Sequence, residues 1–151
     1  MSITVVSLSA IRSKKILNKY KRIVKNIQPQ NLNVKYFDKS EVLDLVTDIF
    51  DEQELNKLKQ VCPVHLVRNI EPHNDSGFLD GSMLSHHVYF LVIESKLKDI
   101  GHYDAPTDNF MFCGKKSIEL HENTLYKFDA KKMHAVMVDK LVTGFTFWSN
   151  K

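Results

Sequence analysis

The sequence is poor in cysteine and has no long hydrophobic run. Cys62 and Cys113 are its only two cysteines, and they do not form a CxxC pair. This favours two reduced, buried thiols over a disulfide framework. No apolar run is long enough to span a bilayer. The first residues, MSITVVSLSAIRSKK, place apolar residues before basic ones, which is the reverse of a signal peptide. These absences predict a cytoplasmic protein that is neither exported nor embedded in a membrane.

The remaining composition is typical of a globular protein. Hydrophobic residues make up 43% of the chain and charged residues 26%, and the formal net charge is only +3. A chain of 151 residues is long enough for one domain with a substantial core. We therefore expect a single domain over residues 1–151, with a mainly helical part at 1–60 and a strand-rich part at 61–151.

Basic residues are concentrated near the N-terminus. Residues 12–25, RSKKILNKYKRIVK, contain five lysines, two arginines and no acidic residue, and their apolar residues recur at helical spacing. The pattern predicts an amphipathic helix with a basic outer face. Such a face is either solvated, while the apolar side covers a sheet, or it contacts nucleic acid or another polyanion. The polyanion contact would use Lys14, Lys15, Lys19 and Lys21.

Further helical signals follow up to residue 60. Pro29 ends the basic helix, and the alternating stretch LNVKYF at 32–37 predicts a short strand. Asp38 is a candidate cap for the next helix, and Asp51 for the one after it. Neither of these two helices carries a catalytic pattern.

From residue 61 onward the sequence consists of strand-length runs separated by turns. Seven runs are expected to be strands, at residues 61–70, 86–95, 109–114, 116–120, 123–128, 132–138 and 141–150. Seven strands in about 90 residues is a density typical of a sandwich or barrel. The sequence therefore predicts an α+β fold, with N-terminal helices packed on one face of an antiparallel β-sandwich.

All seven histidines follow residue 64, and two of them have the spacing of a metal site. His73 and Asp75 stand one residue apart, just after the first predicted strand, and His134 follows Asp75 by 59 residues. Two histidines and one carboxylate form the ligand set of non-haem Fe(II) oxygenases, which leaves positions open for a co-substrate and oxygen. Alternatively, His73 and Asp75 are turn residues with local hydrogen bonds, and His134 is a histidine at the edge of the core.

Three stretches in this order resemble the Fe(II)/2-oxoglutarate-dependent oxygenases, most of all the aspartyl/asparaginyl β-hydroxylases and their proline hydroxylase relatives. The stretches are IEPHND at 70–75, SHHV at 85–88, and TLYKFD at 124–129 leading to HAV at 134–136. The resemblance covers roughly residues 61–149 and implies a double-stranded β-helix, a cupin-like jelly roll. It also implies that His73, Asp75 and His134 bind Fe(II), and that His87 helps to hold 2-oxoglutarate.

The arginine that binds the far carboxylate of 2-oxoglutarate in this family is missing from its usual position. The resemblance puts it about nine or ten residues after His134, where this sequence has Thr143 and Gly144. A second family arginine is replaced by Ser85, and the chain contains only three arginines. Several residues are candidates to supply a charge or a hydroxyl contact instead: Arg68, Lys127, Lys140, Tyr89, Ser85 and Thr143.

The sequence therefore leaves three functions open. The first is an Fe(II)/2-oxoglutarate-dependent dioxygenase that hydroxylates an amino-acid or peptide side chain. The second is a non-catalytic jelly-roll protein whose basic helix binds a macromolecule. The third is a cupin-type metalloenzyme that does not use 2-oxoglutarate. In an enzyme, the polar connection at 96–109 would border the mouth of the barrel, where His102, Tyr103 and Asp104 could contact a substrate.

Overall fold

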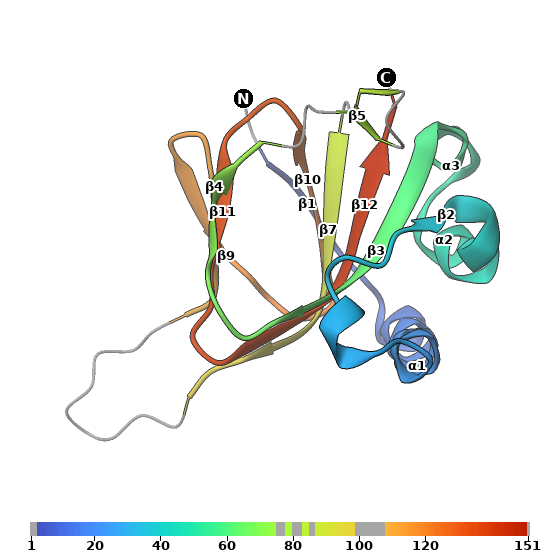
Figure 1. Cartoon of the computed structure of the whole chain (residues 1–151), viewed down its shortest axis with the longest axis horizontal. Helices are drawn as coiled ribbons and strands as arrows, with labels where there is room; N and C mark the ends of the chain where they lie inside the picture. Colours follow the sequence, from blue (N-terminus) through green and yellow to red (C-terminus); the bar gives the residue numbers. More distant parts are fainter. Residues whose placement is uncertain (1–2, 75–77, 80–82, 85–86, 99–107, 151) are drawn as a thin grey trace.

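Two antiparallel sheets face each other, and helices cover the outer side of the larger sheet (Figure 1). The computed structural model describes residues 3–74, 78–79, 83–84, 87–98 and 108–150. Within this part of the chain, the strands form sheets of six, four and two strands.

The larger sheet has six strands. In spatial order they are β1 (Thr4–Ser7), β10 (Thr124–Asp129), β7 (His87–Lys96), β12 (Leu141–Ser149), β3 (Leu58–Leu66) and β2 (Phe37–Asp38). All neighbouring pairs are antiparallel. The sequence order is thus strongly interleaved, since the last strand of the chain lies between β7 and β3.

The smaller sheet has four short strands. In spatial order they are β4 (Ile70–His73), β11 (His134–Met137), β8 (Phe110–Cys113) and β9 (Lys116–Glu119). A separate two-stranded ladder joins β5 (Phe78–Leu79) to β6 (Met83–Leu84). Strands β4 and β11, which carry the two histidines of the predicted metal site, are direct neighbours.

The helices occupy the N-terminal part of the chain. They are α1 (Ala10–Lys25), η1 (Pro29–Asn31), η2 (Lys39–Val42), α2 (Leu43–Ile49) and α3 (Glu52–Lys57). Ser9 caps α1 and Asp51 caps α3, each by accepting a hydrogen bond from a backbone N–H in the first turn. Asp38 and Glu41 form a capping box at η2.

The larger sheet has a hydrophobic core on each of its faces. The outer core joins the helices to the sheet, and it includes Ile16 and Tyr20 of α1 together with Phe145 of β12. The inner core lies between the two sheets, and it includes Phe90 of β7 and Val136 of β11. Because both faces of the central strands are buried, these strands are mostly apolar and show little regular alternation in polarity.

The predicted antiparallel jelly roll is confirmed. Five of the seven predicted strands agree with β7, β8, β9, β10 and β12 to within one residue at each end, and the predicted strand at 132–138 is shortened to β11. The N-terminal strand β1 was not predicted. Its four residues are all exposed in their burial pattern, so they lack the alternation that marks a half-buried strand.

Two predicted strands were wrong in their bounds. The stretch 32–37 is a strand only at its end, because Asn33 has a φ of 73° and its side chain exchanges two hydrogen bonds with the backbone of His65. The run 61–70 was expected to be one strand. The chain instead leaves the larger sheet after Leu66 and enters the smaller one at Ile70, through an exposed turn.

Candidate active site

His73 and His134 lie side by side on neighbouring strands of the smaller sheet. They are directly opposite each other in the β4–β11 ladder, and their ring centroids are 4.3 Å apart. The register shifts between His134 and Val136, so the ladder is irregular next to the pair. The structure therefore brings together two of the three predicted metal ligands, from positions 61 residues apart in the sequence.

Each imidazole is oriented by a backbone carbonyl. The Nδ1 atom of His73 lies 2.8 Å from the carbonyl oxygen of Glu71, and that of His134 lies 3.1 Å from the carbonyl oxygen of Lys132. A carbonyl oxygen can only accept, so each Nδ1 carries the proton in these bonds and donates it. In a neutral ring of this tautomer the lone pair is on Nε2, which is the arrangement found in histidines that bind metals.

The two histidines differ in burial. His134 is 6% exposed and packs edge-on against the ring of Phe128, with 4.7 Å between centroids, whereas His73 is only half-buried. His134 is therefore fixed by packing as well as by its hydrogen bond. His73 lies closer to solvent, on the side from which a ligand could enter.

Asp75, the third predicted ligand, lies outside the described residues. In the part of the chain that the structure describes, no group of three or more histidine, cysteine or acidic side chains is arranged to hold a metal ion. A site with three protein ligands would thus need Asp75 or another residue from one of the gaps in the described ranges.

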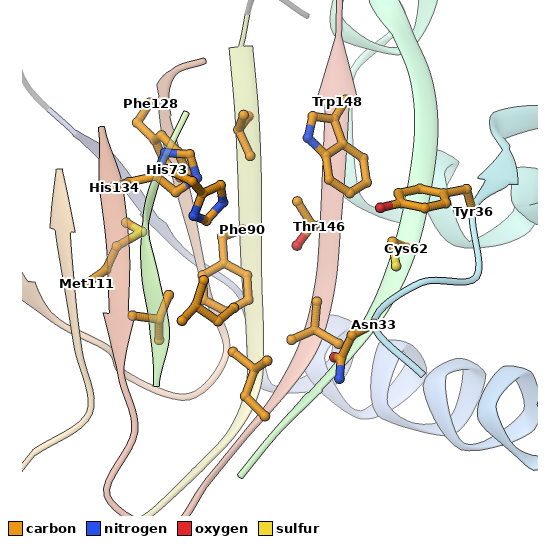
Figure 2. Close-up of a pocket in the computed structure, with 15 residues that line it drawn as sticks. Asn33, Tyr36, Cys62, His73, Phe90, Met111, Phe128, His134, Thr146 and Trp148 are labelled. Carbon is orange, nitrogen blue, oxygen red and sulfur yellow. The ribbon is translucent and has the colours of Figure 1, made fainter. Parts of the chain in front are cut away.

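A cavity of about 300 Å³ opens between the two sheets, with both histidines in its wall (Figure 2). The opposite wall contains Trp148 of β12 and Tyr36, whose ring centroids are 5.5 Å apart. Phe90 and Thr146 lie between the two walls. This volume is at the lower end of the range for pockets that bind small molecules.

Several polar residues of this cavity were not predicted from the sequence. They are Asn33, Tyr36, Cys62, Thr146 and Trp148. The signal for two of them is the alternation in the segment FTFW, where Phe145 and Phe147 join the outer core while Thr146 and Trp148 face inward. The others come from strand β3 and the irregular segment before β2, and no motif marks them.

The thiol of Cys62 is uncharged in this setting. Cys62 is 1% exposed, and its burial raises the pKa of the thiol to about 12. The S–H group donates a weak hydrogen bond to the carbonyl oxygen of Pro63. Cys62 therefore contributes a neutral, soft surface to the cavity and no reactive thiolate.

Three of the residues proposed to hold 2-oxoglutarate lie on the far side of the larger sheet, away from the cavity. Tyr89 belongs to the outer core, and its hydroxyl donates to a carboxylate oxygen of Glu54. The ammonium group of Lys127 lies over the ring of Tyr89. The hydroxyl of Thr143 donates to Glu94. Burial and the bond to Glu54 raise the pKa of Tyr89, so its phenol stays protonated.

The other proposed residues do not line the cavity either, where the structure describes them. His87 falls on the outer face by strand alternation, since its neighbour Val88 faces inward. Arg68 and Lys140 lie in exposed turns. Ser85 lies outside the described residues, as do the possible substrate contacts His102, Tyr103 and Asp104.

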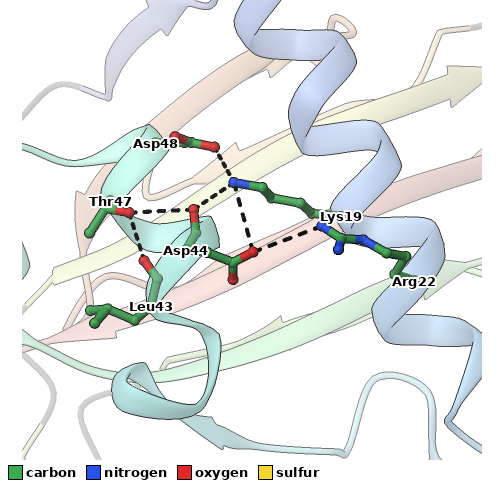
Figure 3. A network of polar contacts seen from close by, with 6 residues as sticks. All are labelled: Lys19, Arg22, Leu43, Asp44, Thr47 and Asp48. Atoms are coloured by element: carbon green, nitrogen blue, oxygen red, sulfur yellow. Dashed lines mark hydrogen bonds and ion pairs between the residues drawn. The ribbon is translucent and has the colours of Figure 1, made fainter.

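The basic face of α1 is partly neutralised by α2. The ammonium group of Lys19 binds the carboxylate of Asp48 and the carbonyl oxygen of Asp44, and Arg22 lies 3.8 Å from the carboxylate of Asp44 (Figure 3). Lys19 is only 17% exposed. Of the four lysines predicted for a polyanion contact, Lys19 is thus bound to α2, whereas Lys14, Lys15 and Lys21 are exposed.

The fold is similar to that of prolyl hydroxylases. A prolyl hydroxylase from Trichoplax adhaerens, solved with a peptide fragment of the hypoxia inducible factor oxygen degradation domain, matches with a TM-score of 0.57 and 12% identity, over 97% of this chain and 82% of that chain. A prolyl-4-hydroxylase from Pseudomonas putida matches with a TM-score of 0.57 and 12% identity, over 99% and 87%. No protein-family model and no curated protein sequence matches the chain.

This likeness establishes the double-stranded β-helix and, at 12% identity, nothing finer. Among the described residues, no helix combines the length and the apolar composition that a membrane crossing requires.

Proposed function

We propose that the protein is a non-haem iron oxygenase whose Fe(II) is held by His73, Asp75 and His134. The observation that carries this proposal is the paired placement of His73 and His134, with both Nδ1 atoms bound to backbone carbonyls. A histidine with only a structural role could donate its hydrogen bond from either ring nitrogen. Two such histidines would therefore not need to share this orientation.

The two described ligands fit a ferrous ion. Both imidazoles present Nε2, and a carboxylate from Asp75 would complete the set of two histidines and one carboxylate. A ferrous ion held there would supply the activation of molecular oxygen. The carbonyls of Glu71 and Lys132 keep the two rings in the required tautomer, and Phe128 holds His134 in place. The largely apolar lining of the cavity would limit the access of bulk water to an ion held there.

The substrate that we propose is an amino-acid or peptide side chain. Support comes from the Trichoplax adhaerens prolyl hydroxylase, which was solved with a bound peptide. The partly exposed position of His73 agrees with a substrate that approaches from solvent. Small-molecule amino acids and peptides are both compatible with this side of the site.

2-Oxoglutarate does not fit the described cavity. Its lining contains no lysine and no arginine among the described residues, and a buried carboxylate needs a paired charge or several donors. This observation favours a second candidate, a cupin-type metalloenzyme that uses the same two histidines without 2-oxoglutarate. Both candidates bind the metal at the same histidines, and they differ in whether 2-oxoglutarate is the co-substrate.

The metal site is tested by anaerobic titration of the metal-free protein with Fe(II), and with Co(II) as a visible probe. We expect one equivalent to bind, and His134→Ala to weaken binding by at least about 100-fold, because it removes a ligand. Asp75→Ala is expected to act in the same direction. His121→Ala is the matched control, since the side chain of His121 is 65% exposed and its Nε2 atom lies 3.8 Å from a carboxylate oxygen of Glu119.

Addition of 2-oxoglutarate to the anaerobic Fe(II) protein then separates the two candidates. A visible charge-transfer band that depends on 2-oxoglutarate would support the dioxygenase, and bound iron without this band would support the cupin-type enzyme. Unchanged metal binding in His134→Ala would refute the site itself. In that case the basic helix would become the leading functional surface, and reversing the charge of Lys14, Lys15 and Lys21 would test polyanion binding.

A further inference from the structure

The two positions at which the family resemblance expects the arginine, Thr143 and Gly144, cannot carry a cation into the cavity. Thr143 faces the outer side of the sheet, where it is 2% exposed and bound to Glu94. A Cβ atom at Gly144 would lie 1.8 Å from the carbonyl oxygen of Leu91. A register shift between these two residues on β12 sets this arrangement. Neither position can hold a long charged side chain that points between the sheets.

Among the described residues, no lysine or arginine takes their place. Every lysine and arginine of the chain except Lys151 falls in the described ranges, and none of them lines the cavity. The polar groups in the wall are neutral hydroxyl, amide, thiol and indole groups, together with the two histidines. A dicarboxylate that entered this space would leave at least one carboxylate without an opposite charge, at a large desolvation cost.

The lining is instead suited to an aromatic ring. Trp148 and Tyr36 form one wall, Phe128 and the two imidazoles form the other, and Phe90 lies between them (Figure 2). Ring edges and faces of this kind attract another ring in offset or edge-on geometry. The hydroxyl of Thr146 lies opposite Phe90 in the β7–β12 ladder and provides a polar contact inside the cavity.

From these observations we infer that the cavity between the sheets binds an uncharged aromatic molecule of one or two rings, and not a dicarboxylate. That such a molecule meets the metal as substrate or co-substrate rests on the proposed function. The binding of this molecule to the cavity does not depend on the metal, because most residues of the cavity wall are not proposed metal ligands. The two proposals can therefore fail separately.

Trp148 is the reporter for the test, because it is the only tryptophan and lies in the cavity wall. The indole N–H of Trp148 gives a single signal in the NMR spectrum of ¹⁵N-labelled protein. We would titrate 2-naphthol, 2-naphthoate and 2-oxoglutarate into the metal-free protein and into the Zn(II)-loaded protein. The two naphthalenes share a shape and differ in charge, so their comparison isolates the effect of the carboxylate.

We expect 2-naphthol to shift the Trp148 signal saturably in the metal-free protein, with an affinity at least tenfold higher than that of 2-naphthoate or 2-oxoglutarate. Equal or tighter binding of 2-oxoglutarate would overturn the inference, even if the metal site is real. Absence of a shift with all three compounds would overturn it as well. If the protein bound 2-naphthol but did not bind Zn(II), the metal site alone would be refuted.

A variant with a restored charge gives an independent check. Thr146→Lys introduces an ammonium group into the cavity wall, and we expect it to tighten 2-naphthoate binding by at least tenfold. Ser117→Lys on the exposed strand β9 adds the same charge away from the cavity and should change nothing. If a well-folded Thr146→Lys protein, judged by its amide spectrum, bound 2-naphthoate no better than wild type, the absence of a cation could not be what excludes the carboxylate.

Discussion

At the scale of single residues, the backbone around Gly144 excludes any side chain at this position of β12. Its strand β12 is hydrogen-bonded on both sides, to β7 and to β3, so it cannot move away from either neighbour. Because the contact of Gly144 is with the backbone of Leu91 and not with a flexible side chain, repacking cannot relieve it. The absence of a side chain at this position is therefore a requirement of the sheet.

Gly144→Ala should lower the free energy of unfolding by about 3 kcal/mol, because the added methyl group forces two central strands apart. Gly114→Ala is the matched control. Gly114 has a φ of 60° but open space around it, so the same change there should cost only about 1 kcal/mol of backbone strain. Urea unfolding of both variants measures the difference, and equal losses would contradict the predicted clash.

At the scale of elements, α1 packs against the larger sheet through its apolar face and is joined to α2 by a polar network. Tyr20 packs edge-on against Phe145, and the hydroxyl of Tyr20 donates to the carbonyl oxygen of Val64. Lys19, one residue earlier, reaches two acceptors on α2. The helix is therefore held by its apolar face and by one of its basic residues, while its remaining lysines stay in solvent.

Lys19→Met keeps most of the aliphatic stem but removes the ammonium group that binds Asp44 and Asp48. We expect a loss of about 1 kcal/mol in stability, as for a partly buried ion pair. The loss should shrink at about 1 M salt, where charges are screened within a few ångströms. Lys14→Met, at an exposed position, should change stability by less than about 0.5 kcal/mol. An equal effect of both variants in urea unfolding would argue against the network.

At the scale of the whole molecule, the proposed metal site would join two distant parts of the chain. A ligand that binds only the folded state stabilises it by mass action, by about 2.7 kcal/mol at a free concentration of 100 times its Kd. For a chain of this size, Co(II) at that concentration should raise Tm by roughly 5–10 °C. Calorimetry of wild type and His134→Ala measures the effect, and an equal rise in both would show that the stabilising metal binds elsewhere.

The sequence predicted most of the strands and singled out His73 and His134, but it did not predict which residues of each strand face the cavity. His73 and His134 were found because their spacing and flanking residues resemble a known motif. Tyr89 was assigned to the cavity although it lies on the outer face, because six successive residues of β7, from Val88 to Ile93, are all buried. When both faces of a strand are buried, the sequence does not alternate in polarity, and only the packing of the helices decides which residues face the cavity.

The cavity residues were also beyond prediction for a physical reason. Asn33 and Tyr36 come from an irregular segment, and Cys62 comes from a strand that is apolar over most of its length. Their meeting depends on contacts between segments far apart in the sequence. The absence of a family arginine was visible in the sequence, whereas the clash that prevents a replacement at Gly144 required the backbone positions of β7 and β12.

The position of β12 also has a consequence for biosynthesis. This strand is the last one of the described chain, yet it lies in the middle of the larger sheet between β7 and β3. During translation, β3 and β7 emerge from the ribosome well before the strand that joins them, and their edges stay unpaired until then. Until β12 is made, the nascent chain is thus exposed to edge-to-edge aggregation, and its many non-local pairings favour slow folding.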